Sequence, residues 1–220
     1  MPGQSKVRVC LWIAGGISLG VAWATPLTTM AGSSFFIHMT LHMLVVAIAA
    51  PLLSLGIAGS SFDPVRYVPA IFAAIPASVG ELLIVWAWHL PALHHAARHT
   101  ALGLIVEQLS FLIVGLWIWL SAFGGPSPRN RGRSGAGVIA LLLTSMHMTL
   151  LGALLALAPR PLFQHHRGLG SLSALEDQHL GGAVMLAVGG IVYLSGGLWL
   201  TVDLLRRPEA VDLTRTGLEP

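Results

Sequence analysis

Six long runs of apolar residues follow one another along the chain, separated by short segments rich in proline, glycine and arginine. Each run approaches the roughly 20 residues that a helix needs to cross a bilayer. The runs are rich in leucine and alanine and lack the strict alternation of barrel strands. They cover residues 7–25, 33–56, 69–90, 101–123, 136–158 and 179–203. The pattern therefore predicts an all-α fold, a polytopic transmembrane helix bundle of about six spans.

The composition agrees with a chain that avoids water. Of its 220 residues, 55% are hydrophobic and 10% are charged, whereas soluble domains carry about 25% charged residues. We expect one transmembrane domain over residues 1–205 and a polar cytoplasmic tail over residues 206–220. The sequence Ala22-Trp23-Ala24 is similar to a signal-peptidase site, but we interpret the first run as a retained span.

The positive charges predict the orientation. If the N-terminus is inside, nine of the twelve lysines and arginines lie in cytoplasmic segments, and Arg98, Arg160 and Arg167 lie outside. Positive residues concentrate on the cytoplasmic side of membrane proteins, so both termini are predicted to be cytoplasmic. Because the basic residues sit in short loops, they indicate topology, and we expect no nucleic acid partner.

The histidines lie on one side of the predicted membrane. In this orientation all ten fall in the outer half of the bundle or in an outer loop. They are His38, His42, His89, His94, His95, His99, His147, His165, His166 and His179. We interpret the five in loops (94, 95, 99, 165 and 166) as solvated residues that at most capture metal transiently. The single cysteine excludes an internal disulfide and a cysteine-cluster site.

Two segments combine histidine with methionine. In residues 38–43 the order His-Met-x-x-His-Met places His38 and His42 on one helix face, and residues 146–148 read Met-His-Met. Imidazole binds copper, zinc, iron and nickel, and thioether sulfur favours Cu(I). Counted at about 1.5 Å per residue, His42 and His147 reach similar depths and could meet. The alternative is that each histidine bonds to a neighbouring helix while methionine fills space.

Two glutamates lie inside predicted spans, where ionisable residues are costly and usually functional. By depth, Glu81, Glu107 and Gln108 could form one polar layer with His42 and His147. A carboxylate there could ligate or neutralise a metal, or orient a histidine ligand. It could instead relay protons, or stay protonated and bond to a neighbouring helix.

The last span begins with Asp177-Gln178-His179. An acidic residue at a helix N-terminus is favoured as a cap and by the helix dipole, so we expect Asp177 to cap its own helix. His179 is an outer candidate ligand.

Small residues also recur at helical spacing. Gly182, Gly189 and Gly196 are seven residues apart in the last span, and Gly16 and Gly20 form a small-xxx-small pair in the first. Both patterns predict close helix packing.

Taken together, these motifs resemble those of the CtaG-type cytochrome c oxidase assembly factors, a family of bacterial multi-span membrane proteins. The likeness spreads from the second span to the sixth. The matching stretches are His-Met-Thr-Leu-His-Met at 38–43, Trp-His-Leu-Pro at 88–91, the run from Met146 to Phe163, and Asp-Gln-His-Leu-Gly-Gly at 177–182. One departure is Gln108, where members often have histidine.

The resemblance implies a non-enzymatic chaperone in the bacterial cytoplasmic (inner) membrane that helps to mature the haem-copper oxidase, with copper as its metal. By motif it points to His38, His42, His89, His147 and His179. Its implied partners are cytochrome c oxidase subunits, periplasmic copper chaperones and membrane lipid.

Our leading hypothesis is copper binding and delivery from a His/Met site in the outer half of the membrane. Its candidate metal ligands are His38, His42, His147, His89, His179, Met39, Met43, Met146 and Met148. The candidate supporting groups are Glu81, Glu107 and Asp177.

Two alternatives remain open. A membrane oxidoreductase could hold b-type haem between histidines of facing helices. A scaffold or transporter could conduct protons or ions through the polar layer, and its activity would then depend on the two glutamates rather than on the histidines.

Overall fold

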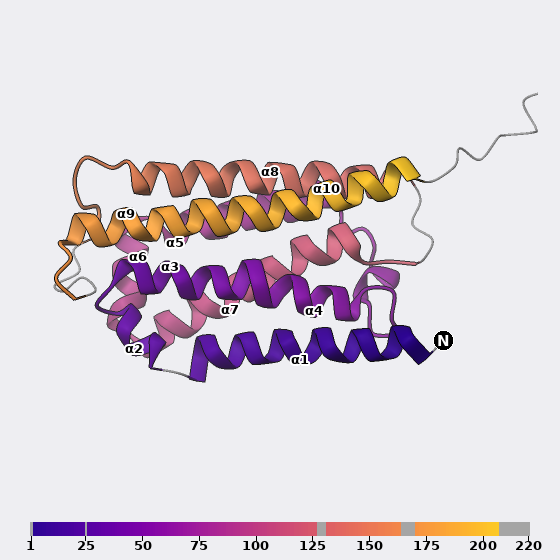
Figure 1. The fold of residues 1–220 in the computed structure, drawn as a ribbon, viewed down its shortest axis with the longest axis horizontal. Coiled ribbons are helices and arrows are strands. Elements are labelled where there is room, and N and C mark those ends of the chain that lie inside the picture. Colours follow the sequence, from indigo (N-terminus) through magenta and orange to yellow (C-terminus); the bar gives the residue numbers. More distant parts are fainter. Residues whose placement is uncertain (1, 25, 127–130, 164–169, 207–220) are drawn as a thin grey trace, which may run out of the picture.

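The computed structural model describes residues 2–24, 26–126, 131–163 and 170–206. Within those residues every regular element is a helix, and the helices run back and forth between the two ends of an elongated bundle (Figure 1). Five helical stretches are long and apolar enough to cross a membrane, and a sixth apolar helix is shorter, with 15 residues. The predicted all-α bundle of about six spans is confirmed.

Two of the six spans are composite. The second runs through α3 (Phe35–Met43), the π-helical segment η1 (Leu44–Ala49) and α4 (Ala50–Ile57), and the sixth runs through α9 (Ala174–Val184), the π-helical segment η3 (Met185–Gly189) and α10 (Gly190–Arg206). The others are α1 (Pro2–Ala24), α5 (Ala74–Trp88), α7 (Ala101–Phe123) and α8 (Arg131–Ala156). Of the predicted polar tail, all but Arg206 lies outside the described residues.

Three short helices connect the spans: α2 (Leu27–Ala31), the 3₁₀ turn η2 (Pro64–Arg66) and α6 (Pro91–His99). The segment of α6 was predicted to be a loop. It is helical because Pro91 occupies the first turn, where its missing N–H costs nothing. Thr100 then breaks the helix, and its hydroxyl caps α7 by accepting a hydrogen bond from Gly103 N at 2.9 Å.

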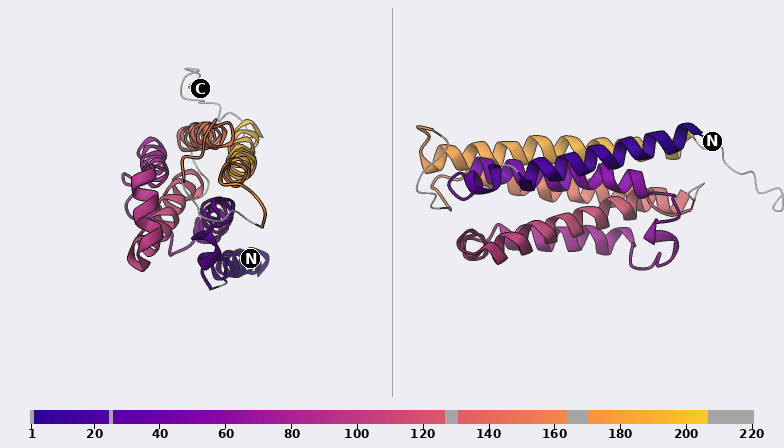
Figure 2. Two further views of the ribbon diagram at one scale, coloured as in Figure 1. Left: turned by 90° about the vertical axis from the view of Figure 1, so that its left-hand side faces the viewer. Right: turned by 90° about the horizontal axis from the view of Figure 1, so that it is seen from below.

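The second span forms the centre of the bundle. Seen from one end, it lies between α1 on one side and α7 and the sixth span on the others (Figure 2). Side chains such as Leu41, Val45 and Val46 are fully or almost fully buried. By contrast, α1 packs mainly against α4 and η1 and leaves most of its surface exposed. The histidines of α3 are therefore held in the most enclosed part of the protein.

Gly182 allows α9 to approach α8 closely, as the glycine spacing of the sixth span predicted, and Gly152 of α8 lies on the other side of this contact. A Cβ on Gly152 would lie 2.7 Å from Leu186 N, and one on Gly182 would overlap Ala156 N. The expectation for Gly16 and Gly20 was wrong within this chain, since nothing lies within 4 Å of a Cβ at either position. Instead, α1 turns its opposite face toward α4.

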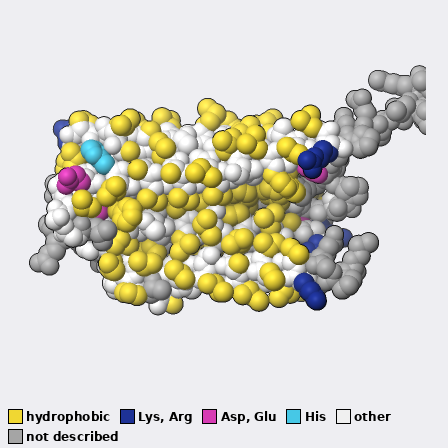
Figure 3. Space-filling view, in the orientation of Figure 1, with side chains coloured by type: hydrophobic (Ala, Val, Ile, Leu, Met, Phe, Trp, Pro, Cys, Tyr) yellow, Lys and Arg dark blue, Asp and Glu magenta, His cyan; other side chains and the backbone are white. Residues whose placement is uncertain are grey.

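The two ends of the bundle differ in charge. On the face shown in Figure 3, hydrophobic side chains cover much of the surface between the ends, and most of the visible lysine and arginine side chains lie at the end where the chain begins. Among the described side chains, this end carries Lys6, Arg8, Arg66, Arg133 and Arg206, and the opposite end carries Arg98 and Arg160. The asymmetry matches the predicted orientation, so the histidine-bearing end remains the predicted outer end.

Candidate metal centre

The first turn of α3 is fixed by a carboxylate from another helix. Asp177 Oδ2 accepts a hydrogen bond from Phe35 N at 2.6 Å, and Asp177 Oδ1 accepts one from Ser34 Oγ at 2.7 Å. The expectation that Asp177 caps its own helix was wrong, because Ser173 and Glu176 already form a capping box on α9. Asp177 instead sets the position of the helix that carries His38 and His42.

His38 and His42 project from one face of α3 into the bundle. Their exposed fractions are 1% and 0%. Within the described part of the chain, neither ring nitrogen of either residue has a hydrogen-bond partner. Buried polar atoms without partners are rare and point to an unseen ion, water or functional role. The alternative in which these histidines bond to neighbouring helices is therefore unsupported at these two positions.

His94 joins them from α6. It was expected to be a solvated loop residue, but only 3% of it is exposed. Its ring centroid lies 4.8 Å from that of His38 and 4.5 Å from that of Phe163. A signal was available in the sequence, because His94, Ala97 and Arg98 follow Pro91 at positions that share one helix face. The neighbouring His95 is exposed.

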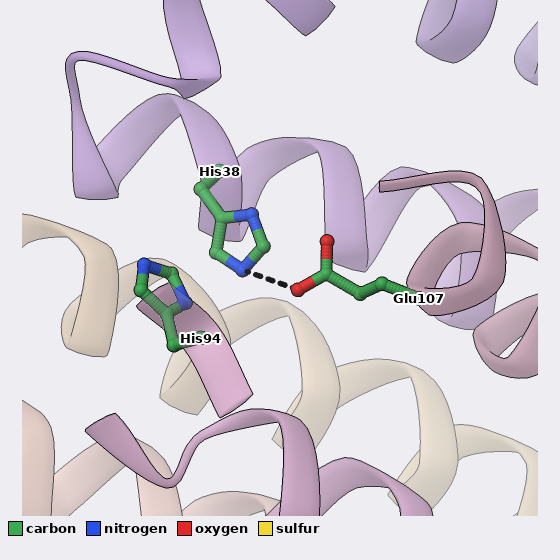
Figure 4. Close-up of side chains that lie close together, drawn as sticks. All are labelled: His38, His94 and Glu107. Carbon is green, nitrogen blue, oxygen red and sulfur yellow. Dashed lines mark ion pairs between the residues drawn. The ribbon is translucent and has the colours of Figure 1, made fainter. Parts of the chain in front are cut away.

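Glu107 of α7 completes this cluster. Its Oε1 atom lies 3.7 Å from His38 Nε2, and its Oε2 atom accepts a hydrogen bond from Arg98. The candidate ligand atoms of His38, His94 and Glu107 all lie within 4.8 Å of one another (Figure 4). All three residues are buried. Two imidazoles and a carboxylate can together hold a divalent transition metal.

A second group of donors lies beside the first. His89 Nδ1 donates a hydrogen bond to Val85 O at 2.6 Å, and His89 Nε2 lies 3.4 Å from Met39 Sδ. The rings of His89 and His42 are 5.5 Å apart, centroid to centroid. These residues were all predicted as ligands, and the structure brings them together.

Two predicted ligands of α8, Met146 and His147, lie outside both groups of donors. His147 lines a groove of about 730 Å³ with Ser78 and Leu82 of α5, whereas the ring of His42 packs against those of His89 and Phe111. Met146 is 67% exposed. The depths estimated from the sequence did not include the direction in which α8 turns its side chains.

Met43 and Met148 lie together against η3. A Cβ built on Gly189 would lie 3.7 Å from Met43 Sδ and 3.4 Å from Met148 Cβ. Both methionines are buried. They pack at the junction of the second, fifth and sixth spans.

Gln178 and His179 tie the sixth span to the end of the fifth. Gln178 Nε2 donates to Leu155 O at 3.3 Å, and Gln178 Oε1 accepts from Leu162 N at 2.7 Å. His179 Nε2 donates to Ala158 O at 2.9 Å. The motif at 177–179 thus joins three elements through consecutive side chains, and His179 has one nitrogen engaged.

Glu81 and Gln108 also have partners of their own. Glu81 Oε1 accepts a hydrogen bond from Tyr193 of α10. Gln108 Oε1 accepts one from Trp23 of α1 at 3.3 Å. The residues of the predicted polar layer therefore lie in separate sites. Of Glu81, Glu107 and Gln108, it is Glu107 that lies in the cluster with His38 and His94. Predicted loop residues His165 and His166 lie outside the described residues, as does the side chain of His99.

The fold and the site define a class: a multi-pass helical membrane protein with a buried His/Glu cluster at one end. Compared with known families, residues 2–207 match the family described as cytochrome c oxidase caa3 assembly factor. The chain belongs to this family, which confirms the resemblance seen in its motifs. No curated protein and no solved structure matches the chain.

Proposed function

We propose that this protein is a non-catalytic assembly factor that binds copper at the outer end of its bundle and delivers it to a subunit of cytochrome c oxidase. Membership of the assembly factor family supports the oxidase as the target. The observation that carries the copper proposal is the buried cluster of His38, His94 and Glu107, whose ligand atoms converge within 4.8 Å.

The donor chemistry fits a transition metal. Both nitrogens of His38 and the Oε1 atom of Glu107 are buried and make no hydrogen bond to any described residue. A bound cation would satisfy these atoms, which otherwise lose their solvation without compensation. Imidazole and carboxylate ligands also bind zinc and iron, so copper is chosen because of the family's oxidase target.

The position of the cluster suits transfer. His94 lies on α6, a short helix that connects two spans at the predicted outer end. Copper arriving from a periplasmic chaperone would meet this end of the bundle first. The proposed partners are accordingly a periplasmic copper donor and an oxidase subunit in the bacterial cytoplasmic membrane.

Metal retention by the purified protein tests this proposal. The detergent-solubilised protein is loaded with copper, washed and analysed for bound metal. Wild-type protein should retain copper, and His94→Ala and Glu107→Gln should retain less. His95→Ala is the matched control, since this exposed neighbour on α6 lies outside the cluster. Absence of retained copper in the wild type, or equal retention in all variants, would overturn the proposed site.

An absorption spectrum separates copper binding from the haem alternative. A haem held between two histidines has its macrocycle between their rings, whereas the rings of His38 and His94 pack directly at a centroid distance of 4.8 Å. We therefore expect no Soret band from the purified protein.

A further inference from the structure

The contact between His89 and Met39 joins two atoms that both carry lone pairs. A carbonyl oxygen only accepts hydrogen bonds, so the 2.6 Å contact with Val85 O places the proton of a neutral His89 on Nδ1. Nε2 is then an acceptor, and it faces the sulfur of Met39 at 3.4 Å. A thioether has no proton to donate. Nothing in this pair therefore supplies the positive charge between the two atoms that would make the contact favourable.

The distance between His89 Nε2 and Met39 Sδ is typical of two ligands bound to the same metal ion. Metal–nitrogen bonds of about 2.1 Å and metal–sulfur bonds of about 2.3 Å, at a near-tetrahedral angle, place the two donors roughly 3.5 Å apart. The 3.4 Å between His89 Nε2 and Met39 Sδ matches this span. A hydrogen bond from Nδ1–H to a backbone carbonyl is also the usual way in which a metal-binding histidine is oriented.

His42 supplies a third donor. Its ring centroid lies 5.5 Å from that of His89, it is fully buried, and neither of its nitrogens has a hydrogen-bond partner in the described chain. Met39 and His42 are three residues apart on α3, so they lie on neighbouring positions of one helix face. His89 reaches them from the end of α5.

We infer that His42, His89 and Met39 form a second metal position, selective for Cu(I), beside the cluster of His38, His94 and Glu107. Thioether sulfur favours Cu(I), whereas the carboxylate of Glu107 suits harder ions. The two positions are adjacent, because His38 precedes Met39 in the chain and its ring lies 6.5 Å from that of His89. A Cu(I) ion held at either position can pass to the other by exchange of ligands along α3, and it stays Cu(I) throughout. This inference rests on the proposed copper function and adds a second binding position to it.

X-ray absorption at the copper edge tests the inference. Purified protein is loaded anaerobically with Cu(I), and the scattering shells around copper are determined. Wild-type protein and Glu107→Gln should both show a sulfur neighbour at about 2.3 Å. Met39→Leu should lose that sulfur shell and one equivalent of Cu(I). Met185→Leu is the control, because Met185 is an equally buried methionine on η3.

Selenomethionine labelling of the otherwise unchanged protein keeps the test independent of whether Met39→Leu folds. Selenium-edge spectra of the copper-loaded protein should show a copper neighbour. Copper bound with only nitrogen and oxygen neighbours in the wild type would overturn the second position while leaving the proposed function intact. Absence of any bound copper would overturn both.

Discussion

The guanidinium of Arg98 donates a hydrogen bond to the carboxylate of Glu107. Arg98 comes from α6 and is 8% exposed in its side chain, and Glu107 is fully buried on α7. The other carboxylate oxygen faces His38 at 3.7 Å. A positive charge therefore already lies on one side of the carboxylate that is proposed to bind metal.

Removal of this charge should make stability depend on metal. In Arg98→Gln the buried carboxylate loses its partner, and breaking a buried ion pair costs about 3–5 kcal/mol. We expect the metal-free variant to melt at a lower temperature than wild type and to gain more stability from copper, because the ion replaces the lost charge. Thermal unfolding with and without copper measures both effects. Arg160→Gln, an exposed arginine at the same end, should behave like wild type, and equal copper-induced shifts in Arg98→Gln and wild type would contradict the prediction.

The cap provided by Asp177 should matter to the metal site. Asp177→Ala removes two hydrogen bonds from the first turn of α3, and loss of a helix cap costs about 0.5–2 kcal/mol. We expect lower stability and reduced copper retention, since α3 carries His38, Met39 and His42. Glu176→Ala is the control, because it removes a cap from α9 only. Comparable copper retention in the two variants would count against a positioning role for Asp177.

Glu81 and Tyr193 should contribute to stability without affecting copper. In Tyr193→Phe the carboxylate of Glu81 loses a buried hydrogen-bond donor, which costs about 1–3 kcal/mol. We expect a lower unfolding temperature and unchanged copper retention. Tyr67→Phe removes a hydroxyl from a tyrosine that is 71% exposed and should change neither quantity. A loss of copper in Tyr193→Phe would contradict this prediction and would indicate that Glu81 supports the metal site.

Two glycines should respond very differently to the same substitution. Gly182→Ala forces a methyl group against the backbone of α8, and overpacking typically costs about 1–3 kcal/mol. Gly16→Ala adds the same group where nothing lies within 4 Å, so its unfolding temperature should be close to that of wild type. Thermal unfolding of the two variants in one detergent makes the comparison. Alanine favours a helix over glycine at both positions, so similar losses would contradict a packing role for Gly182.

The sequence by itself determined the helical spans and the grouping of histidines at one end. Both follow from local rules: a run of about 20 apolar residues must become a helix in lipid, and residues four apart on a helix share a face, as His38 and His42 do. The motifs also carried enough information to indicate the family that the match over residues 2–207 confirms.

Only the tertiary structure decided which residues meet. Span depth could not distinguish Glu107, which contacts His38, from Glu81, which contacts Tyr193, because depth along a helix axis says nothing about the direction in which a side chain points. Asp177 caps a helix that lies 142 residues away in the chain. His94 is buried because its ring packs against Phe35 and His38 of α3 and against Phe163. These contacts depend on how the helices rotate and pack against one another, which the pattern of one segment does not contain.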